Sequence, residues 1–460
     1  MLNDEQRRDF IKYALLGLSC LASPSLSAIA ANKGRLAGQT VIVIGAGVSG
    51  LSAAQQLVSA GAQVVVLEAK NRIGGRLWTD RSLGIPFEMG AGWLHGPVAN
   101  PITQLAEQVS AQRFVTDDES LIVYTSDGQQ ISAEQLQQGW LDFEQLLSAV
   151  EQRLAELDED ISLAQALREL PDSTAKSALM KWALSAFSEF DSGAGINLLS
   201  AYYFDQDLAF KGADQVFPNG YDAILQPLAN ALDIKLEQNV QSISYSDAAV
   251  QVTTDRANFE ADYVIVTLPL GVLKSASVNF IPPLPERQQQ LIDKLGMGNV
   301  TKVGLLYEHC FWPPDTQYFG YMSKTDGQFP YFMNSKTFSA GHLLVGICVG
   351  DYAWEIERKI DAQISREVTA ILRQMFGNKV PPPKQIIVSR WSVDPCSYGS
   401  YSYSSVGSAP EDFNLFGQVL DKRLLFAGEH TLFDYHGTVH GAYLSGITAV
   451  KRLIALVKSH

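Results

Sequence analysis

A strand, a glycine-rich turn and a helix that follow one another near the N-terminus constrain this fold most strongly. A β-branched run at 40–44 leads directly into Gly45, Gly47 and Gly50, and residues 51–57 then have helical periodicity. The first glycine permits a tight turn, the second lets a pyrophosphate approach the backbone, and the third lets the helix pack close to the strand. This order predicts a Rossmann-type unit that binds a dinucleotide at the helix N-terminus.

A second β-branched run, at 63–67, supports the dinucleotide site. It ends at Glu68, about twenty residues beyond the glycines, where a carboxylate can bind ribose hydroxyls. A nucleotide ligand is favoured by this order of elements: a strand, the glycines, a helix, a second strand and an acid. They do not distinguish NAD from FAD.

Composition excludes several other classes of protein. The 460 residues are 46% hydrophobic and 18% charged, which predicts a compact chain of more than one domain. The net charge is -14 and no long basic run occurs, so nucleic acid is not expected as a partner. An acidic surface suits a cationic ligand and equally suits plain solubility. The four cysteines form no pair or cluster with metal spacing, so neither a disulfide scaffold nor a metal site is expected.

The first thirty residues have the pattern of a targeting segment. Arg-Arg-Asp-Phe-Ile-Lys at 7–12 precedes an apolar stretch at 13–22 and small residues that end with Ala-Ile-Ala at 28–30. The paired arginines resemble a bacterial twin-arginine signal; a short anchor or an ordinary basic N-terminus is the alternative. We therefore expect residues 1–30 to direct the folded protein through the twin-arginine export machinery into the periplasm, with no stable membrane insertion after processing.

Motifs at both ends of the chain decide between the dinucleotides by resemblance. Arg-Ile-Gly-Gly-Arg stands at 72–76, Glu-Met-Gly-Ala-Gly-Trp-Leu-His-Gly at 88–96, and Leu-Phe-Ala-Gly-Glu-His-Thr at 425–431, before the glycine-rich segment 437–446. From about residue 40 to the end, the chain resembles the flavin-containing amine oxidase family, in the form of the polyamine oxidases. The resemblance implies FAD, held by Gly45, Gly47, Ser49, Gly50, Glu68, Arg76, Gly90, Ala91, Gly92, Trp93, Val240, Trp391, Gly428, Glu429, Thr438 and Val439.

The same resemblance implies an α/β (α+β) fold of two interleaved domains. A Rossmann-type FAD-binding domain is expected from 38–100, 217–285 and 390–460, and a substrate-binding domain of mixed sheet plus helices from 101–216 and 286–389. Within the second domain, residue patterns predict strands at 302–307, 342–349 and 385–390, and helices around 136–170, 175–187 and 364–375.

Lys302 and Tyr401 are the leading catalytic candidates. Lys302 lies in a β-branched run, where a lysine is awkward as plain core, although a surface lysine on an alternating strand is the alternative. The resemblance implies that Lys302 holds a water against flavin N5. It also makes Tyr401 one aromatic wall of a substrate cage, where cation–π attraction favours an amine. Ser400 stands where monoamine oxidases have a cysteine bonded to the flavin, so we expect non-covalent FAD.

Thr438, His95 and Glu189 refine the expected substrate. Thr438 stands where monoamine oxidases have a second cage aromatic, and polyamine oxidases and histone demethylases share this small residue, which favours longer, secondary amines. His95 is expected to accept a hydrogen bond from a charged amine or to respond to its protonation; a structural histidine is the alternative. Glu189 is expected to bind a distal amino group. Three other acids are alternatives for that role: Asp191, Asp205 and Asp207.

Together these residues predict FAD-dependent oxidation of a cationic amine, with a polyamine favoured. By resemblance, a hydride passes to flavin N5, the imine is hydrolysed, and molecular oxygen re-oxidises the flavin with release of hydrogen peroxide. One alternative is an L-amino-acid oxidase, which needs an arginine for the substrate carboxylate. Another is a flavin-binding protein without turnover. The export signal and the lack of a chromatin-reading region do not favour histone demethylation.

Overall fold

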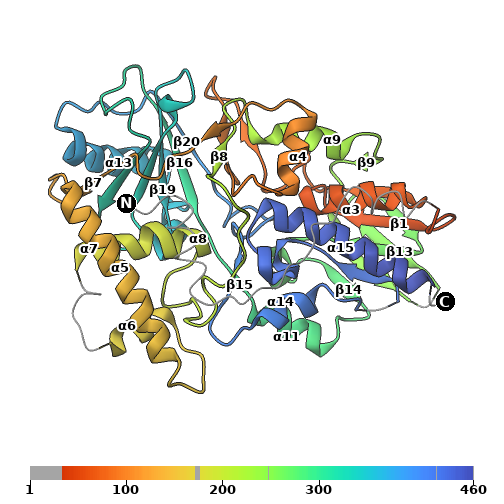
Figure 1. Ribbon diagram of the computed structural model, residues 1–460. Helices are drawn as coiled ribbons and strands as arrows, with labels where there is room; N and C mark the ends of the chain where they lie inside the picture. The colour runs from red at the N-terminus through yellow and green to blue at the C-terminus, as the bar shows by residue number, and fades with distance from the viewer. Residues whose placement is uncertain (1–33, 171–176, 247, 421, 459–460) are drawn as a thin grey trace.

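The structure is a computed structural model that describes residues 34–170, 177–246, 248–420 and 422–458. The expected twin-arginine segment, residues 1–30, lies outside the described residues. In the described part, no helix combines the length and the apolar character needed to cross a membrane. Figure 1 shows a half built around the labelled elements α3, β1, β13 and α15, and another built around α5, α7, β16 and α13.

A five-stranded parallel sheet lies beneath the predicted dinucleotide site. Its strand order is β22-β13-β1-β2-β9. The strands are β1 (Thr40–Ile44), β2 (Gln63–Leu67), β9 (Ile234–Lys235), β13 (Tyr263–Val266) and β22 (Leu424–Phe426). Long β-branched runs suit such a sheet because both of its faces are covered. All five strands come from the three segments expected to form the FAD-binding domain, whose exact borders stay a prediction.

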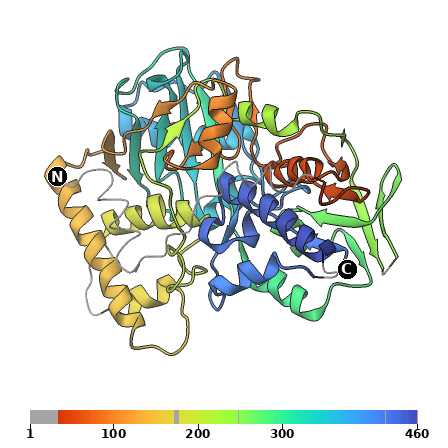
Figure 2. The same cartoon turned by 45° about the vertical axis from the view of Figure 1, so that its right-hand side comes forward.

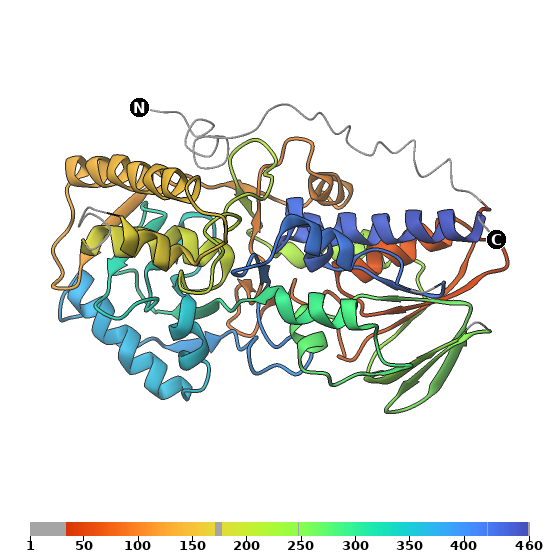
Figure 3. The same cartoon turned by 90° about the horizontal axis from the view of Figure 1, so that it is seen from below.

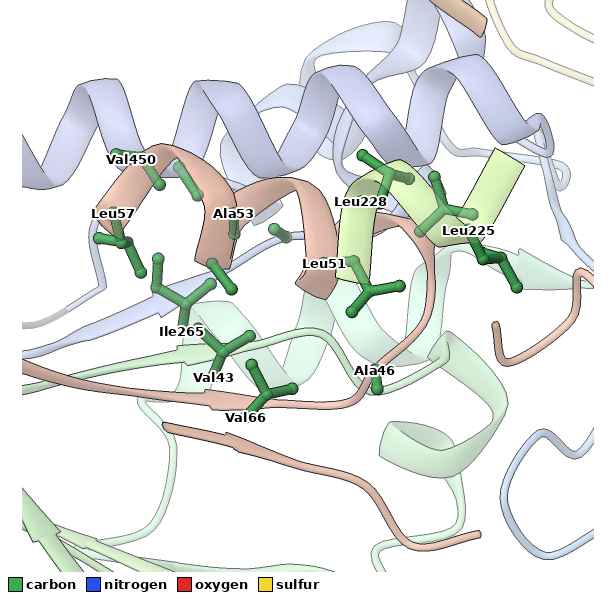
Figure 4. Packing of buried hydrophobic residues seen from close by; sticks show 14 of the residues in the cluster. Val43, Ala46, Leu51, Ala53, Leu57, Val66, Leu225, Leu228, Ile265 and Val450 are labelled. Carbon is green, nitrogen blue, oxygen red and sulfur yellow. The ribbon is translucent and has the colours of Figure 1, made fainter. Parts of the chain in front are cut away.

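Helices α3 (Val48–Ser59) and α15 (Val439–Lys458) lie side by side on one face of this sheet (Figure 3). Gly446 allows the close approach, because a Cβ there would lie 2.3 Å from the backbone oxygen of Ser49. Figure 4 shows Leu57 of α3 over Val43 of the sheet. This packing holds the N-terminus of α3 at the carboxyl edge of β1, where dinucleotides bind in such sheets.

The other face of the parallel sheet packs against a smaller sheet and short helices. The smaller sheet has the order β12-β11-β10-β14. Figure 2 shows its green strands at the opposite end of the molecule from α5. The elements here are β10 (Val240–Tyr245), β11 (Val250–Thr254), β12 (Asn258–Ala261), β14 (Asn279–Ile281), α10 (Leu270–Lys274), α11 (Glu286–Lys294) and α14 (Pro410–Phe416).

A six-stranded mixed sheet forms the core of the other half and confirms the predicted sheet-plus-helix architecture. Its order is β20-β16-β19-β18-β17-β7, antiparallel except for the parallel pair β17 and β7. The strands are β7 (Leu121–Thr125), β16 (Thr301–Leu306), β17 (Tyr318–Met322), β18 (Tyr331–Asn334), β19 (Leu343–Cys348) and β20 (Gln385–Val388). The three strands expected here from sequence are thus confirmed within one or two residues at each end.

Helices cover both faces of the mixed sheet. Helix α13 (Asp361–Phe376) packs on one face, as predicted. The single helical region expected at 136–170 is instead two helices, α5 (Ala133–Leu154) and α6 (Leu163–Glu169), because Ser162 caps a new helix N-terminus. Helix α7 (Ala178–Ala183) continues into a π-helical turn, η2 (Leu184–Glu189).

Short elements lie within and between the two halves. They are β3 (Thr79–Asp80), β4 (Phe87–Glu88), β5 (Trp93–Leu94), α4 (Pro101–Gln108), β6 (Phe114–Val115), α8 (Phe190–Ser192), β8 (Gln215–Val216), η3 (Tyr221–Ile224), α9 (Leu225–Ala229), β15 (Gly296–Met297), η4 (Ser335–Thr337), α12 (Gly350–Ile356), β21 (Ser402–Tyr403), η5 (Glu429–Thr431) and η6 (Phe433–Tyr435). Several of them carry predicted site residues, among them Trp93 in β5 and Glu429 in η5.

Candidate active site

The glycine turn after β1 is shaped for a ligand. Gly45 has a φ of +102°, and a Cβ there would lie 2.6 Å from the hydroxyl of Thr267. A Cβ on Gly50 would lie 1.9 Å from the backbone oxygen of Gly45. A Cβ on Gly47, by contrast, would meet only the backbone oxygen of Gly74, at 4.0 Å. Gly45 and Gly50 are therefore required by the turn and its packing, and Gly47 leaves its backbone accessible.

Charged groups beside this turn suit a dinucleotide diphosphate and ribose. Glu68 accepts hydrogen bonds from the backbone N–H groups of Ala46 (2.8 Å) and Lys70 (2.9 Å). Arg72 donates through Nη1 to the backbone oxygen of Gly75, and its buried Nη2 has no hydrogen-bond partner. Burial lowers the pKa of Arg72, against the opposing charge of Glu68. A partly buried guanidinium whose buried Nη2 is an unused donor at a glycine cradle fits the diphosphate of FAD.

A buried ion pair joins the N-terminal and C-terminal motifs. Arg76 donates through Nη1 to Glu429 Oε1 (2.9 Å) and to the backbone oxygen of Ser400 (2.9 Å). The other Glu429 oxygen accepts from the hydroxyl of Ser402 (2.5 Å) and from the N–H of Gly437 (2.9 Å). Burial alone would raise the pKa of Glu429, but Arg76 and these donors lower it to about 2. The predicted cofactor-binding residues at 76 and 429 are therefore direct partners.

Lys302 is buried, so the surface-lysine alternative is wrong. The side chain, on β16, is 6% exposed. Its Nζ donates to the backbone oxygen of Gly90 (2.6 Å) and lies 4.9 Å from the centroid of the Trp93 ring. A Cβ on Gly92 would lie 3.0 Å from this nitrogen. Burial lowers the pKa of Lys302 to about 8. The structure thus brings Lys302 to the segment from Gly90 to Trp93.

Glu88 is an acid of this site that the sequence reasoning did not select. Its carboxylate accepts from the hydroxyl of Thr79 (2.9 Å) and the N–H of Tyr221 (2.8 Å). Burial raises its pKa to about 7, and the charge of Lys302 opposes that rise. Glu88 is the first residue of the motif 88–96, and this position could have marked it as a site residue. The charges of Glu88 and Lys302 therefore influence each other's protonation.

This pair predicts a specific pH dependence. We expect the rate of FAD reduction by a saturating amine to change between about pH 7 and pH 9, as Lys302 loses its proton. Because the Glu88 carboxylate stabilises the ammonium form, Glu88→Gln should lower the pKa of Lys302 and move this change to lower pH, by about one pH unit. Anaerobic stopped-flow measurements across this range, with Glu260→Gln on exposed β12 as the control, test this. An unmoved profile would exclude Glu88 as the charge partner.

An aromatic cluster lies beside Lys302; we define it as Trp93, Phe190, Tyr318, Tyr331 and Tyr401. Trp93 and Phe190 meet edge to face at 5.9 Å, and Tyr318 stacks on Tyr331 at 4.9 Å. The hydroxyl of Tyr401 donates to the backbone oxygen of Phe190. The predicted wall residue Tyr401 is thus one of five aromatic groups. Three of them were not selected from the sequence. Tyr318 and Tyr331 come from separate segments with no motif, and Phe190 follows Glu189 in a segment where only the acids were considered.

His95 has an acidic partner that the sequence did not indicate. Its Nδ1 lies 2.8 Å from Asp214 Oδ2, and the N–H of Gly96 donates to Asp214 Oδ1 (3.0 Å). The imidazole is half-exposed, at 54%, and follows Trp93 and Leu94 of β5, which pairs with β8. Asp214 therefore orients the ring of His95 close to the aromatic cluster. Contact between His95 and a substrate stays a prediction.

Glu189 and Thr438 have local structural partners. Glu189 ends η2 and is buried; it accepts from the hydroxyl of Ser185 (2.7 Å) and the N–H of Ile196 (3.1 Å), and burial raises its pKa. Each Glu189 carboxylate oxygen thus has a hydrogen-bond donor within the protein, one from Ser185 and one from Ile196. Binding of a distal amine by Glu189 stays a prediction. Thr438 accepts from the N–H of Gly441 (2.9 Å), so its small hydroxyl side chain satisfies a donor at the start of α15.

The other predicted cofactor residues come from several separate elements. Trp391 is buried and donates through Nε1 to the backbone oxygen of Met89 (2.8 Å), beside Gly90 and Ala91. The hydroxyl of Ser49 lies 2.9 Å from that of Ser445, which accepts from the N–H of Gly428 (3.0 Å). Val240 begins β10, and Val439 begins α15.

Among the residues that the structure describes, there is neither a disulfide nor a metal site. Cys310, Cys348 and Cys396 are free thiols there. No three His, Cys, Asp or Glu side chains of these residues are grouped to hold a metal ion.

At the position of the covalent flavin link in monoamine oxidases, Ser400 Oγ accepts from the N–H of Val300 (2.9 Å).

The fold and this site define a dinucleotide-binding oxidoreductase. Residues 48–454 match the family model described as flavin containing amine oxidoreductase. Polyamine oxidase 2 of Arabidopsis thaliana is 34% identical over 431 residues, which cover 90% of this chain and 87% of that protein. The chain therefore belongs to the flavin-containing amine oxidase family, as its motifs predicted. Membership in this family implies a flavin cofactor.

Other relatives set the breadth of this family. The chain is 34% identical over 436 residues to Lysine-specific histone demethylase 1 homolog 2 of Arabidopsis thaliana, covering 90% of this chain but 58% of that protein. It thus spans just over half the length of the first relatives it matches. A solved structure of putrescine oxidase bound to putrescine has a TM-score of 0.76 at 20% identity, covering 91% of this chain and 99% of that one, and it confirms the fold.

Proposed function

We propose that this protein oxidises polyamines with a non-covalently bound FAD. The observation that carries the proposal is the buried Lys302 amine, held at Gly90 and Trp93 beside the aromatic cluster. When bound, FAD accepts a hydride from the carbon next to an amine nitrogen and is re-oxidised by oxygen with release of hydrogen peroxide. The chain's own residues then hold the amine, exclude water and control protons.

The roles of the residues follow from their places. The Lys302 ammonium supplies positive charge and a proton at Nζ next to the glycine segment, where it also holds a water for hydrolysis of the imine product. Tyr401 and Trp93 present aromatic faces to an alkylammonium chain. Gly47 and Arg72 hold the diphosphate, and Glu68 binds ribose hydroxyls.

Charge favours a cationic amine over an amino acid. The acids Asp118, Asp191 and Asp214 all act electrostatically on Tyr331 in the aromatic cluster. They attract ammonium groups and repel the carboxylate of an amino acid. Thr438, which is small, leaves room for a long substrate, and Polyamine oxidase 2 of Arabidopsis thaliana matches this chain over 87% of its own length. These observations support a polyamine over an L-amino acid.

Anaerobic mixing of the FAD-loaded protein with amines tests the reaction class. We expect putrescine, spermidine or spermine to bleach the flavin absorbance faster than benzylamine or any L-amino acid, and an aminoaldehyde to be released in air. Bleaching by an amino acid alone would transfer the assignment to an amino-acid oxidase. No bleaching by any of these compounds would contradict an amine oxidase. Denaturation followed by filtration should release all of the FAD, because no covalent bond is proposed.

We also propose export to the periplasm through the twin-arginine route. The support is the segment 7–12 with its paired arginines, followed by an apolar stretch and small residues. Fusing residues 1–40 to a reporter that crosses the membrane only when folded should place the reporter in the periplasm. Changing Arg7 and Arg8 together to lysine should retain it in the cytoplasm. Export of both fusions alike would contradict the twin-arginine route.

A further inference from the structure

A buried carboxylate stands behind the site and has no part in the proposed chemistry. Glu357 directly follows helix α12 and is 3% exposed. Its Oε1 accepts from Asn299 Nδ2 (3.0 Å) and from the Thr301 hydroxyl (2.8 Å), whose hydrogen also has the backbone oxygen of Ala353 within reach (2.9 Å). Its Oε2 accepts from the N–H (2.8 Å) and the hydroxyl of Ser392. Within the described residues, no Lys or Arg side chain forms an ion pair with this carboxylate, although Arg390 donates to the backbone oxygen of Glu357. Four neutral donors satisfy the carboxylate.

Two of these donors adjoin residues of the candidate active site. Thr301 precedes Lys302 on β16, and because side chains alternate along a strand, the Thr301 hydroxyl reaches Glu357 while Lys302 reaches Gly90 on the opposite face. Ser392 follows Trp391, whose indole donates to the backbone oxygen of Met89 (2.8 Å). Glu357 thus bridges the strand that carries Lys302 and the loop that carries Trp391, and both of those residues contact the segment 89–90.

The third donor extends the connection toward the arginine of the flavin motif. Asn299 Oδ1 accepts from the hydroxyl of Ser400 (3.2 Å), and the same hydroxyl oxygen accepts from the N–H of Val300 (2.9 Å). The backbone oxygen of Ser400 accepts from Arg76 (2.9 Å), and Tyr401 is the next residue. One carboxylate therefore connects the segments that carry Lys302, Trp391 and Tyr401.

We propose that Glu357 is a positioning residue that sets the distance between Lys302, Trp391 and the glycine segment 89–92. The carboxylate acts through Thr301 and Ser392 and touches neither substrate nor cofactor. This inference rests on the proposed function, since it concerns how the same site is aligned. Displacements of reacting groups of about 1 Å can cost about a hundredfold in rate, so a buried bridge of this kind has a measurable effect.

The first test is Glu357→Gln, compared with the matched control Glu355→Gln on the exposed face of α12. The amide keeps the size of the side chain but replaces one acceptor oxygen with an NH2 donor. That donor then faces either the donors of Asn299 and Thr301 or the two donors of Ser392. We expect the maximal rate of anaerobic FAD reduction to fall at least about tenfold, with less than about a threefold change in the amine concentration for half-saturation. The visible circular dichroism of bound FAD should also change, because the surroundings of the ring shift. Glu355→Gln should match the wild type.

A second pair of variants separates alignment from folding. Thr301→Val and Ser392→Ala each remove one hydroxyl donor without introducing a new donor beside the carboxylate. We expect each to slow FAD reduction, and Thr301→Ser, which restores the hydroxyl, to recover most of the wild-type rate. If Glu357→Gln does not fold, these variants still test the bridge. A loss of stability alone would leave the visible circular dichroism of the folded, FAD-loaded variant unchanged.

The outcomes distinguish this inference from the proposed function. Wild-type rates and wild-type visible circular dichroism in Glu357→Gln, Thr301→Val and Ser392→Ala would overturn the positioning role, even if polyamines reduce the wild-type protein. If no amine reduces the wild-type protein, the proposed function fails, and the visible circular dichroism of FAD added to each variant still decides the role of Glu357. A changed spectrum supports the positioning role, and an unchanged one removes it.

Discussion

Lys302→Met is expected to slow either the reduction of FAD by an amine or its re-oxidation by oxygen about a hundredfold, with FAD still bound. The physical reason is the place of Nζ, which is buried, within 2.6 Å of the backbone oxygen of Gly90 and 4.9 Å from the Trp93 ring. Methionine has a similar length and keeps the packing, but it removes the charge and the proton. Stopped-flow measurement of each half-reaction, with FAD content from the absorbance ratio, checks this result.

Lys384→Met provides the matched lysine control, because this side chain is 60% exposed and lies next to β20 of the same sheet. It should leave both half-reactions unchanged. If Lys302→Met reduces and re-oxidises its FAD at wild-type rates, Lys302 has no part in the chemistry. Loss of FAD from this variant would instead assign Lys302 to cofactor binding.

Glu429→Gln is expected to lower both the FAD content and the stability of the protein, by about 3 kcal/mol in the free energy of unfolding. The substitution leaves Arg76 without its anionic partner and places an amide donor against the donors of Ser402 or Gly437. The FAD-to-protein ratio after purification and thermal unfolding at neutral pH measure the two effects. Equal melting temperatures and FAD contents would contradict the role of this pair.

The sign of the pH effect gives a further check on Glu429. Its folded-state pKa is depressed to about 2 from the ordinary value near 4.5. Its contribution to stability is therefore fully present above about pH 4.5 and is lost as the pH falls toward 2. The stability difference between the wild type and Glu429→Gln should shrink over that interval. Glu411→Gln, on the exposed surface of α14, should show no such convergence.

Regular elements were largely predictable because local patterns determine them. The β-branched runs at 40–44 and 63–67 become neighbouring parallel strands, and the glycines between them form the turn. The helical stretch at 136–170 was too long, since periodicity does not reveal that Ser162 begins a new helix. Strand ends differ by a residue or two, because hydrogen bonding across the sheet decides where pairing stops.

The candidate site was predictable only where residues stand in motifs. Lys302, Tyr401, Arg76 and Glu429 follow from the family resemblance, and the sequence alone left a surface position for Lys302 as an alternative. Its burial is decided by β5, which lies 209 residues earlier and brings the Trp93 ring over the ammonium group. Glu88 was also predictable, because it is the first residue of the motif 88–96, but it was not selected as a site residue.

The sequence by itself determined the dinucleotide fold, the flavin family and the acidic, amine-compatible charge of this protein, because each depends on short patterns or on composition. Only the tertiary structure decided which acids interact with the site residues. These acids are Glu88 for Lys302, Asp214 for His95, and Glu357 for Thr301 and Ser392. These contacts join residues 35 to 214 positions apart along the chain. Their distances follow from how the sheets and helices pack, and no local pattern encodes that packing.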